Sequence, residues 1–550
     1  MSETRRIFVL STSAFLARPA NLALSHGYLV DKCVSVRLGS YTMNELNDSV
    51  PASPPKVSRL SKSKFLSGLQ CHKRLYLEIH QPFLATKPDA ATQAMFEMGT
   101  EVGELARSRF PGGVLVTAGY RQSEAALAQT ATLIEDLAVP AIFEAAFLHG
   151  GVLIRADVLE RVPSADGEPC GWRLIEVKSS TRVKDIHLED LAVQSEVIVG
   201  AGLTLVSVGL MHINTAYLYR EGAVDLTELF AIQDLSEAVA QRRAEVPGRL
   251  AEMTRMLLQP HAPAIEPDRH CHTPYDCPFW DHCTKDKPAR WIHYLPGSKQ
   301  VVGQLTQQGV TTIDEIPSGI KLSPVQRRVK ENVEWTSAKL GTALKAVQYP
   351  VHHLDFETVM LAVPRFSETR PYQALPGQWS NHIEQATGEL RHEEFLHKDV
   401  GDPRKVLAES LLESLGEKGS ICVYSPYERS ILEQLAVAIP SLKPALLRLV
   451  ARLWDLFPII RDHYYHPAFG GSYSIKSVLP AMVPSLAYDD LAIKEGGHAA
   501  SQYYRMVFVE TDWIERAAIE EALLRYCERD TLAMVELRRA LKGKAEMKGE

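Results

Sequence analysis

Alternating hydrophobic and polar residues mark two neighbouring strands in the first half of the chain. GVLIRADVLERV (Gly151 to Val162) and WRLIEVKSST (Trp172 to Thr181) are rich in β-branched residues at the two-residue period of a strand, and a polar turn separates them. HLEDLAVQSEVI, the stretch around Gln194, has the pattern of a helix. This succession of strands and helices predicts an α/β fold.

A second strand-rich segment begins at Val351. Its first stretch, VHHLDFETV, predicts a strand, residues 421–436 predict a strand that leads into a helix, and residues 523–537 predict a helix. Before it, from about Trp291 to Ala346, the pattern is helical. Within that connector, residues 302–320 predict a helical hairpin of a kind that contacts DNA backbones.

Breaks in these patterns predict four regions. The chain begins with the order of a secretion signal, two charged residues (Arg5 and Arg6) followed by the partly apolar residues 7–16. Serines and a threonine interrupt the apolar part. We therefore expect residues 1–57 to be an unstructured extension, or the result of a start codon placed too early, with Met43 as the true start. The boundaries then predict a first folded region at 58–288, a helical basic connector at 289–347 and a second folded region at 348–550.

Composition and charge narrow the classes of function. The 550 residues carry a net charge of -7, with 45% hydrophobic and 23% charged residues, as in a globular protein without a global field that attracts nucleic acid. There is no run of 18 apolar residues and no GxxxxGK[ST] loop, so we expect no membrane span and no ATP-driven motor in this chain. Eight cysteines are too few for a disulfide scaffold, which favours a reducing compartment, the cytoplasm.

The connector is locally basic. Six Lys or Arg and two Glu lie between Lys321 and Lys345. Such a balance fits contacts with phosphate and also fits an ordinary solvated helix face.

The first group of candidate residues lies on the two strands described above. Glu176 and Lys178 are two residues apart, so both point to one face of a strand, while Asp157 occupies the preceding strand. Two carboxylates and a lysine on adjacent strands can hold Mg²⁺ or Mn²⁺ and steady a water or a phosphate. The same alternation also occurs on solvated sheet faces without any function.

The order of residues around this group resembles the PD-(D/E)xK nucleases of the RecB type over about residues 58–285. The matching residues are a glutamate, an aspartate, an E-x-K pair and a helical glutamine: Glu144, Asp157, Glu176, Lys178 and Gln194. The resemblance implies a restriction-endonuclease-like domain with a divalent metal ion. The chain departs from the pattern at Gly103, where the family has a metal-binding histidine, and at Ile198, where it has a tyrosine. Three carboxylates are candidates to replace the missing ligand: Glu101, Glu104 and Glu144.

Four cysteines form the second group. Cys271, Cys277 and Cys283 are spaced by five residues in HCHTPYDCPFWDHC, and Cys71 lies far upstream. Structural zinc sites favour pairs two to four residues apart, so an iron–sulfur cluster suits the looser spacing at least as well. Zinc and unliganded thiols remain alternatives. One early and three late cysteines resemble the iron–sulfur RecB-like nucleases, which implies a 4Fe–4S cluster that fastens the two ends of the domain.

The third group lies in the C-terminal region. Asp355 and Glu357 flank Phe356, so the two carboxylates share one face of the predicted strand. Paired carboxylates can bridge two metal ions about 3.5–4 Å apart, the arrangement used for in-line phosphoryl transfer. Tyr526 and Asp530 are one helical turn apart and share a helix face.

Together with Glu428 at a predicted helix start, these residues resemble the RNase H-like 3′–5′ exonucleases of the DnaQ superfamily over about residues 351–541. The resemblance implies that Asp355, Glu357 and Asp530 bind metal ions and that Tyr526 orients the attacking water. Glu428 stands where the family has an aspartate. For Asp455 we expect an exposed position at a strand end, with a helper role at the site as the alternative. For Lys476 we expect a position on the surface of an amphipathic helix, with contact to backbone phosphate as the alternative.

The two resemblances together predict a metal-dependent deoxyribonuclease that acts on single-stranded DNA ends in repair, recombination or defence. A scaffold that binds nucleic acid without cleaving it is the alternative, with Gly103 and Glu428 as signs of decayed sites. A zinc-dependent RNA-binding factor is a third hypothesis. RNA as substrate, the polarity of cleavage and the oligomeric state stay open.

Overall fold

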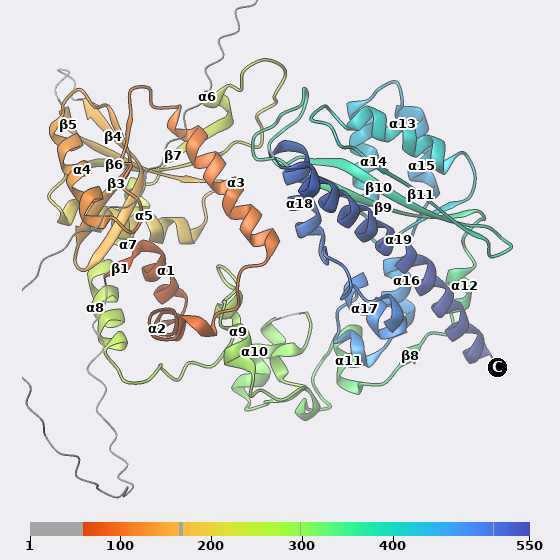
Figure 1. The fold of residues 1–550 in the computed structure, drawn as a ribbon. Coiled ribbons are helices and arrows are strands. Elements are labelled where there is room, and N and C mark those ends of the chain that lie inside the picture. Colours follow the sequence, from red (N-terminus) through yellow and green to blue (C-terminus); the bar gives the residue numbers. More distant parts are fainter. Residues whose placement is uncertain (1–58, 164–168, 298, 510, 550) are drawn as a thin grey trace, which may run out of the picture. The chain divides into compact units, whose positions relative to one another are not determined.

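Two β-sheets with helices on their faces organise the described part of the chain (Figure 1). The structure is a computed structural model that describes residues 59–163, 169–297, 299–509 and 511–549. The predicted extension at 1–57 lies outside these residues. The α/β class is confirmed, and residues 54–550 group together by their contacts as one unit. The boundaries near residues 288 and 347 stay predictions.

The first sheet has the order β2-β3-β4-β5-β6-β7, and β1 pairs with β4. Its strands are β1 (Leu60–Ser61), β2 (Val114–Leu115), β3 (Ala141–His149), β4 (Val152–Pro163), β5 (Pro169–Lys178), β6 (Leu205–Ile213) and β7 (Phe230–Asp234). Strands β3 to β5 are antiparallel, whereas β5 and β6 are parallel, because α5 (Asp185–Gly200) crosses over between them. The two predicted strands and the predicted helix around Gln194 are thus confirmed as β4, β5 and α5.

Helices cover both faces of this sheet. The helices of this region are α1 (Lys62–Gln70), α2 (His72–His80), α3 (Ala90–Arg107), α4 (Ser123–Glu135), α6 (Leu226–Leu229), α7 (Ser236–Arg243), α8 (Val246–Leu257) and α9 (Trp280–Thr284). Leu174 packs in the core beneath α5, while Ile175 packs in the opposite core with Val102 of α3. Because side chains alternate along a strand, Glu176 lies on the α5 face.

Most regular elements of the connector are short helices, but the predicted helical hairpin at 302–320 is wrong. Its elements are α10 (Lys299–Gln307), two 3₁₀ turns (Ile292–Tyr294 and Ile313–Glu315), α11 (Pro324–Glu331), β8 (Trp335–Thr336) and α12 (Leu340–Leu344). Only a single 3₁₀ turn follows α10, since Glu315 caps the backbone N–H of Thr311 and Pro317 prevents extension. Arg328, one of the basic residues, stacks over Trp335 at 3.8 Å and donates to the carbonyl of Arg461, which is a packing role.

The second sheet has the order β11-β10-β9-β12-β13. Its strands are β9 (Val351–Met360), β10 (Ala374–Glu384), β11 (Leu390–Leu396), β12 (Ser420–Val423) and β13 (Leu453–Asp455), and β14 (Tyr464–Tyr465) pairs with β8. Its helices are α13 (Arg404–Leu415), α14 (Tyr427–Ala438), α15 (Lys443–Arg452), α16 (Leu456–His463), α17 (Ile475–Met482), α18 (Gly496–Phe508) and α19 (Trp513–Gly549). Phe356 packs with α13, α14 and α15, so Asp355 and Glu357 face α19.

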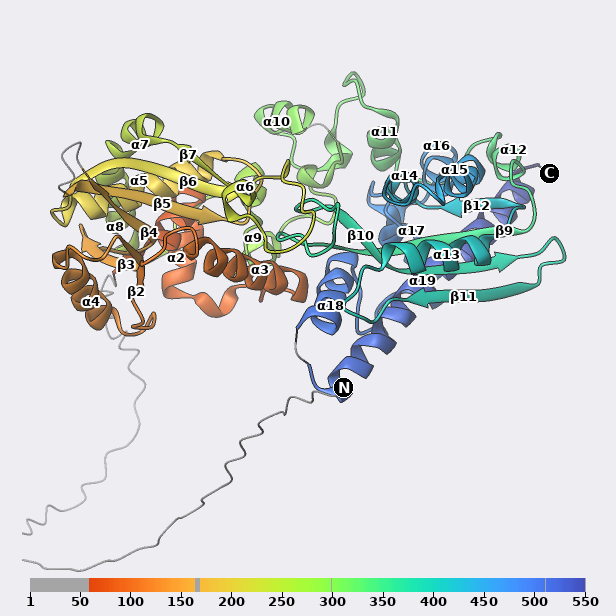
Figure 2. The same cartoon turned by 90° about the horizontal axis from the view of Figure 1, so that it is seen from above.

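Helix α19 crosses β9, β10 and β11 on this face (Figure 2), and polar contacts fix its position along the sheet. Ser380 and His382 of β10 each lie 2.8 Å from the Thr531 hydroxyl, and Gln378 donates to the carbonyl of Leu523 at 3.0 Å. These groups are buried, so sliding the helix by one residue would leave them unpaired, at about 1–3 kcal/mol each. The contacts therefore set where Tyr526 and Asp530 lie.

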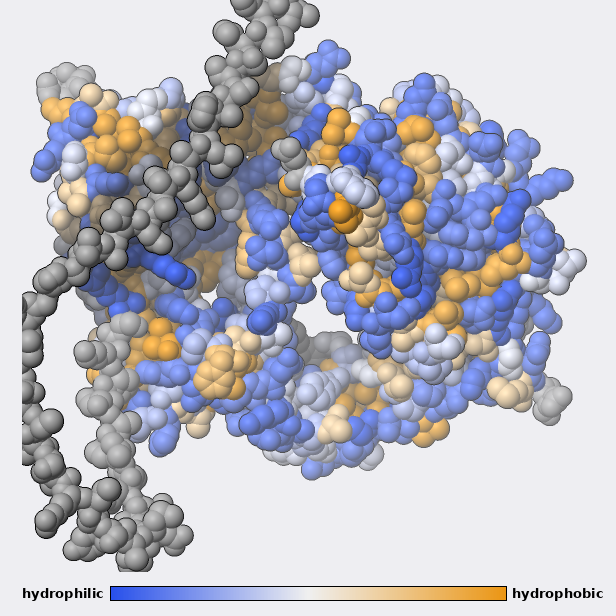
Figure 3. Space-filling view, in the orientation of Figure 1, coloured by the Kyte–Doolittle hydropathy of each residue, from blue (hydrophilic) through white to orange (hydrophobic). Residues whose placement is uncertain are grey.

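The surface in the view of Figure 3 is mainly hydrophilic, with scattered hydrophobic residues. Most apolar side chains instead pack in buried clusters on either side of the two sheets. Among the described residues, no helix combines the length and apolar character needed to cross a membrane.

Candidate functional site

The five N-terminal candidates come together at the first sheet. Glu144 on β3, Asp157 on β4, and Glu176 and Lys178 on β5 line a pocket of about 910 Å³, here called the N-terminal pocket. Gln194 reaches Glu176 from α5, with its amide donating to the carboxylate at 2.7 Å. Asp157 accepts the backbone N–H of Val177 at 2.8 Å, which fixes its carboxylate beside β5.

Glu176 is the most heavily bonded carboxylate of this pocket. It is 1% exposed, and its Oε1 accepts from Lys178 at 2.6 Å and from Lys62 at 2.7 Å. Lys178 also reaches Asp190 at 2.9 Å. The sequence analysis missed Lys62 and Asp190. The spacing of Asp190 one turn before Gln194 was a usable signal, whereas Lys62 lies 114 residues away in α1 and carried none.

The two lysines separate the protonation of the two carboxylates. Burial alone raises the pKa of Glu176, but the ammonium groups of Lys178 and Lys62 bring that pKa well below its usual value. Burial, and then the charge of Glu176, raise the pKa of Asp157 to about 7. One carboxylate is thus neutralised by lysines, while the other gains and loses its proton near neutral pH.

The position of the missing histidine is open space. A side-chain carbon added at Gly103 would meet nothing within 4 Å. Of the three possible replacements, Glu101 instead bonds to Tyr504 at 2.7 Å, and Glu104 is exposed. Only Glu144 lines the pocket.

Glu144 lines the pocket from a strained backbone position. It has a φ of 56°, and the Glu144–Asp157 pair is missing from the otherwise continuous β3–β4 register. A non-glycine residue in the left-handed region costs energy and is often found at functional sites. Arg107 of α3 lies 3.6 Å from its carboxylate.

The five C-terminal candidates line one cavity of about 410 Å³, here called the C-terminal cavity: Asp355, Glu357, Glu428, Tyr526 and Asp530. Strand β9 carries the first two, the first turn of α14 carries Glu428, and α19 carries the last two. Glu428 accepts from the Ser425 hydroxyl at 3.1 Å. Asp455 does lie at a strand end as expected, but it is half-buried and caps α16 by accepting the N–H of Phe457.

The prediction that Lys476 lies on the surface is wrong. Its ammonium group lies in the cavity, 3.1 Å from Asp530 Oδ1 and 3.0 Å from the Tyr526 hydroxyl. A turn at two glycines leads into α17, and Gly471 there has a φ of +86° and packs so closely on Pro296 that a side chain would clash. Tyr488, which the sequence analysis also missed, donates a short hydrogen bond to Asp530.

Burial, with added repulsion between carboxylates, governs the electrostatics of this cavity. Burial, followed by the charges of Asp530 and Glu428, raises the pKa of Asp355 well above its usual value. Burial and the charge of Asp355 do the same for Glu357, and burial raises the pKa of Glu428 to about 7. The carboxylates are thus short of positive charge.

The tightest cluster of possible ligand atoms in the described residues joins Asp355, Glu357 and Cys527, whose ligand atoms lie within 4.8 Å of one another. The Cys527 sulfur is buried, 3.9 Å from Asp355 Oδ2. Burial and the nearby Asp355 raise the pKa of this thiol, so it stays protonated. The oxygens therefore remain the better ligands for a hard cation. Asp530 does not join the cluster.

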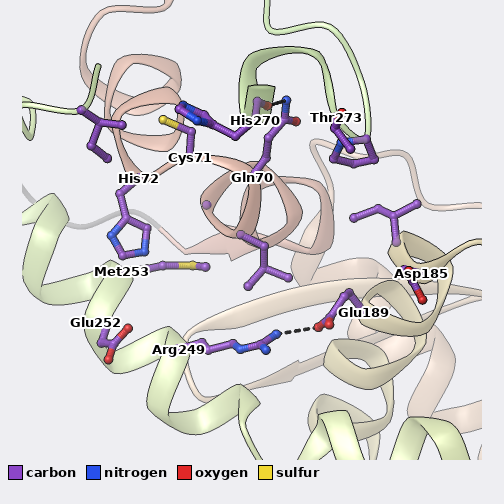
Figure 4. A pocket seen from close by; sticks show the side chains of 15 residues that line it. Gln70, Cys71, His72, Asp185, Glu189, Arg249, Glu252, Met253, His270 and Thr273 are labelled. Carbon is purple, nitrogen blue, oxygen red and sulfur yellow. Dashed lines mark hydrogen bonds and ion pairs between the residues drawn. The ribbon is translucent and has the colours of Figure 1, made fainter. Parts of the chain in front are cut away.

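The four cysteines gather where α1 meets the loop around α9. Cys71 lies between α1 and α2, and the other three lie within residues 271–283, where the N–H of Cys277 donates to the carbonyl of Cys271 at 2.8 Å. The Gln70 side chain donates to the carbonyls of His270 and Tyr275, both at 2.7 Å. Figure 4 shows Cys71 beside Gln70 and His270, at the edge of a pocket of about 810 Å³.

The four cysteine sulfurs are neighbours in space. Four thiolates around a single tetrahedral zinc would lie about 3.8 Å apart. No three of the four sulfurs lie within 4.8 Å of one another. Burial raises the pKa of Cys271, Cys277 and Cys283, and neighbouring cysteines add to each shift, so the thiols lie close enough to interact. The four thiols thus form one group of candidate metal ligands.

Comparison with known proteins reaches one part of the chain. Residues 352–474 match a family described as a domain of unknown function (DUF2779). The matched segment contains Asp355, Glu357 and Glu428 and ends before Tyr526 and Asp530. The search of curated proteins gave no match.

Proposed function

We propose that this chain is a metal-dependent nuclease that hydrolyses phosphodiester bonds of DNA, with single-stranded ends as its substrate. The observation that carries the proposal is the C-terminal cavity, where carboxylates from β9, α14 and α19 surround one space together with Tyr526. A restriction-endonuclease-like fold for the first region and an RNase H-like fold for the second are parts of the same proposal.

In the C-terminal cavity, Asp355 and Glu357 are the residues placed to hold a divalent ion. A bound Mg²⁺ or Mn²⁺ supplies an activated water and stabilises charge on the phosphoryl oxygens. The Tyr526 hydroxyl points into the same space and accepts from Lys476, so its own proton is free to orient a water. Glu428 completes the acidic wall.

In the N-terminal pocket, Asp157, Glu176 and Glu144 supply oxygens, and Lys178 supplies a positive charge for the scissile phosphate. The pocket also contains Lys62, Arg107 and Arg155, which suits a polyanionic substrate.

A 4Fe–4S cluster on Cys71, Cys271, Cys277 and Cys283 would hold the two ends of the N-terminal region together. The hydrogen bonds from Gln70 already join the same two segments. Its role in the proposal is structural.

One observation favours the alternative of a binding scaffold for the N-terminal pocket. Lys62, Lys178 and Gln194 already occupy both oxygens of Glu176, so this carboxylate has little bonding capacity left for an ion. In that reading, the pocket binds nucleic acid and only the C-terminal cavity cleaves it.

A nuclease assay tests the proposal. End-labelled DNA and RNA, single- and double-stranded, are incubated with Mn²⁺ and the purified chain, its Asp355→Asn and Lys178→Met variants, and the double variant. We expect Mn²⁺-dependent shortening of single-stranded DNA that Asp355→Asn removes. Digestion that survives in the double variant would show that neither pocket is responsible.

A further inference from the structure

Lys476 is held in place inside the C-terminal cavity. Its ammonium group bonds to Asp530 and Tyr526 on α19 and lies over the rings of Tyr488 and Tyr526, 3.4 Å and 4.3 Å from their centres. Its side chain is 31% exposed, compared with 72% for Lys405 on the surface of α13. Contacts with two aromatic faces and a carboxylate fix the position of a positive charge.

The same contacts engage one oxygen of Asp530. Lys476 and Tyr488 both bond to its Oδ1. Within the described residues, the compact ligand cluster contains Asp355 and Glu357 but not Asp530. A divalent ion on Asp355 and Glu357 would therefore meet a carboxylate that a lysine has already engaged.

Charge balance agrees with this arrangement. With the four carboxylates of the cavity ionised, one ammonium group and one divalent ion would leave a net charge of only -1; the four are Asp355, Glu357, Glu428 and Asp530. A second ion that used Asp530 as a ligand would lie close to the ammonium group, which is 3.1 Å from Asp530 Oδ1, and would be repelled by it.

We propose that Lys476 is a built-in cation of the C-terminal cavity: it takes the place of a second metal ion, so that the cavity binds a single divalent ion. The inference rests on the proposed function, because it concerns ion binding by the same carboxylates. Lys476 also holds the Tyr526 hydroxyl, which makes it a positioning residue for the water that Tyr526 orients.

Counting bound ions tests this inference without measuring cleavage. Free Mn²⁺ is followed by electron paramagnetic resonance during titration of the full-length protein. The number of ions bound in the cavity is the number bound by each protein minus the number bound by the same protein carrying Asp355→Asn. Lys476→Met removes the charge and keeps most of the stem, and Lys476→Arg keeps the charge. Lys405→Met is the matched control for loss of one surface lysine. If a melting curve shows Lys476→Met to be unfolded, Lys476→Gln replaces it.

We expect one ion in the parent protein, in Lys476→Arg and in Lys405→Met. In Lys476→Met we expect a second ion, or binding of the first that is at least about tenfold tighter because Asp530 joins the ligands. Where a second ion binds, cleavage by Lys476→Met should fall at low Mn²⁺, at which the second site is empty, and recover at high Mn²⁺. Two ions in the parent, or a titration that Lys476→Met leaves unchanged, overturns the inference while the proposed function stands. No ion in any of these proteins overturns both.

Discussion

The N-terminal pocket and the C-terminal cavity place similar carboxylates in opposite electrostatic settings. In the pocket, two lysines bond to one oxygen of Glu176 and bring its pKa below the usual value. In the cavity, one lysine faces four carboxylates, and the pKa values of Asp355 and Glu357 are raised by burial and by neighbouring charges. The pocket is largely neutralised by the chain itself, whereas the cavity depends on protons or an added cation.

The difference predicts how each site changes the stability of the fold. Carboxylates that repel one another destabilise the fold until a cation binds. Such a loss of stability is common at functional sites. Carboxylates paired with lysines contribute to stability instead, because removing one partner of a buried pair leaves an unbalanced charge. The cavity is therefore the better candidate for an ion-binding catalytic site.

The largest expected effect is on activity in the cavity. Glu357→Gln, measured in a protein whose pocket is disabled by Lys178→Met, should lower Mn²⁺-dependent cleavage on the order of 1,000-fold, because loss of an ion ligand removes several kcal/mol of transition-state stabilisation. Glu433→Gln on the exposed side of α14 is the control. Equal rates for Glu357→Gln and the control would remove Glu357 from the mechanism.

Loss of the cysteine cluster should affect only the pocket. Cys277→Ser should eliminate bound iron and sulfide from protein purified without air, and it should lower the unfolding temperature of the N-terminal region. Iron analysis reports on the cluster. Cleavage in a protein whose cavity is disabled by Asp355→Asn reports on the pocket, and cleavage in a protein whose pocket is disabled by Lys178→Met reports on the cavity. Zinc without iron in the native protein would contradict the cluster, and equal loss at both sites would contradict its local role.

Neutralising one carboxylate in each site should change stability in opposite directions. In metal-free protein, Glu176→Gln should lower the free energy of unfolding by about 2–3 kcal/mol, since Lys62 and Lys178 lose their shared partner. Asp355→Asn should raise it by about 1 kcal/mol, because it removes a source of repulsion. Urea unfolding with a chelator measures both, and shifts of the same sign would break the comparison.

An effect of similar size is expected on the pH dependence of stability. The pKa of Glu428 is raised to about 7 by burial, so the folded protein holds this proton more tightly than the unfolded chain does. Stability without metal should therefore fall by about 1–3 kcal/mol as pH rises from about 4.5 to 7. Glu428→Gln should remove the contribution of Glu428 to the slope of stability against pH. Asp157→Asn should remove the contribution of Asp157, whose pKa is also about 7. If both variants leave the curve of stability against pH unchanged, the raised pKa values of Glu428 and Asp157 are contradicted.

Much of the local structure follows from the sequence, because period and spacing determine which residues share a face. Alternation predicted β4, β5 and β9, and the one-turn spacing of Tyr526 and Asp530 placed both in the cavity. Lys62 and Lys476 were beyond such reasoning, since each meets its carboxylate only through tertiary packing of distant segments. The hairpin at 302–320 failed because a side-chain cap and a proline overrode the apolar pattern.

The central claim, that distant carboxylates form sites for divalent cations, is tested most directly by anomalous X-ray scattering from crystals soaked in Mn²⁺. We predict a manganese peak between Asp355 and Glu357, with Lys476 still bonded to Asp530. Crystals that take up Mn²⁺ elsewhere but show no peak at these two carboxylates would contradict the account.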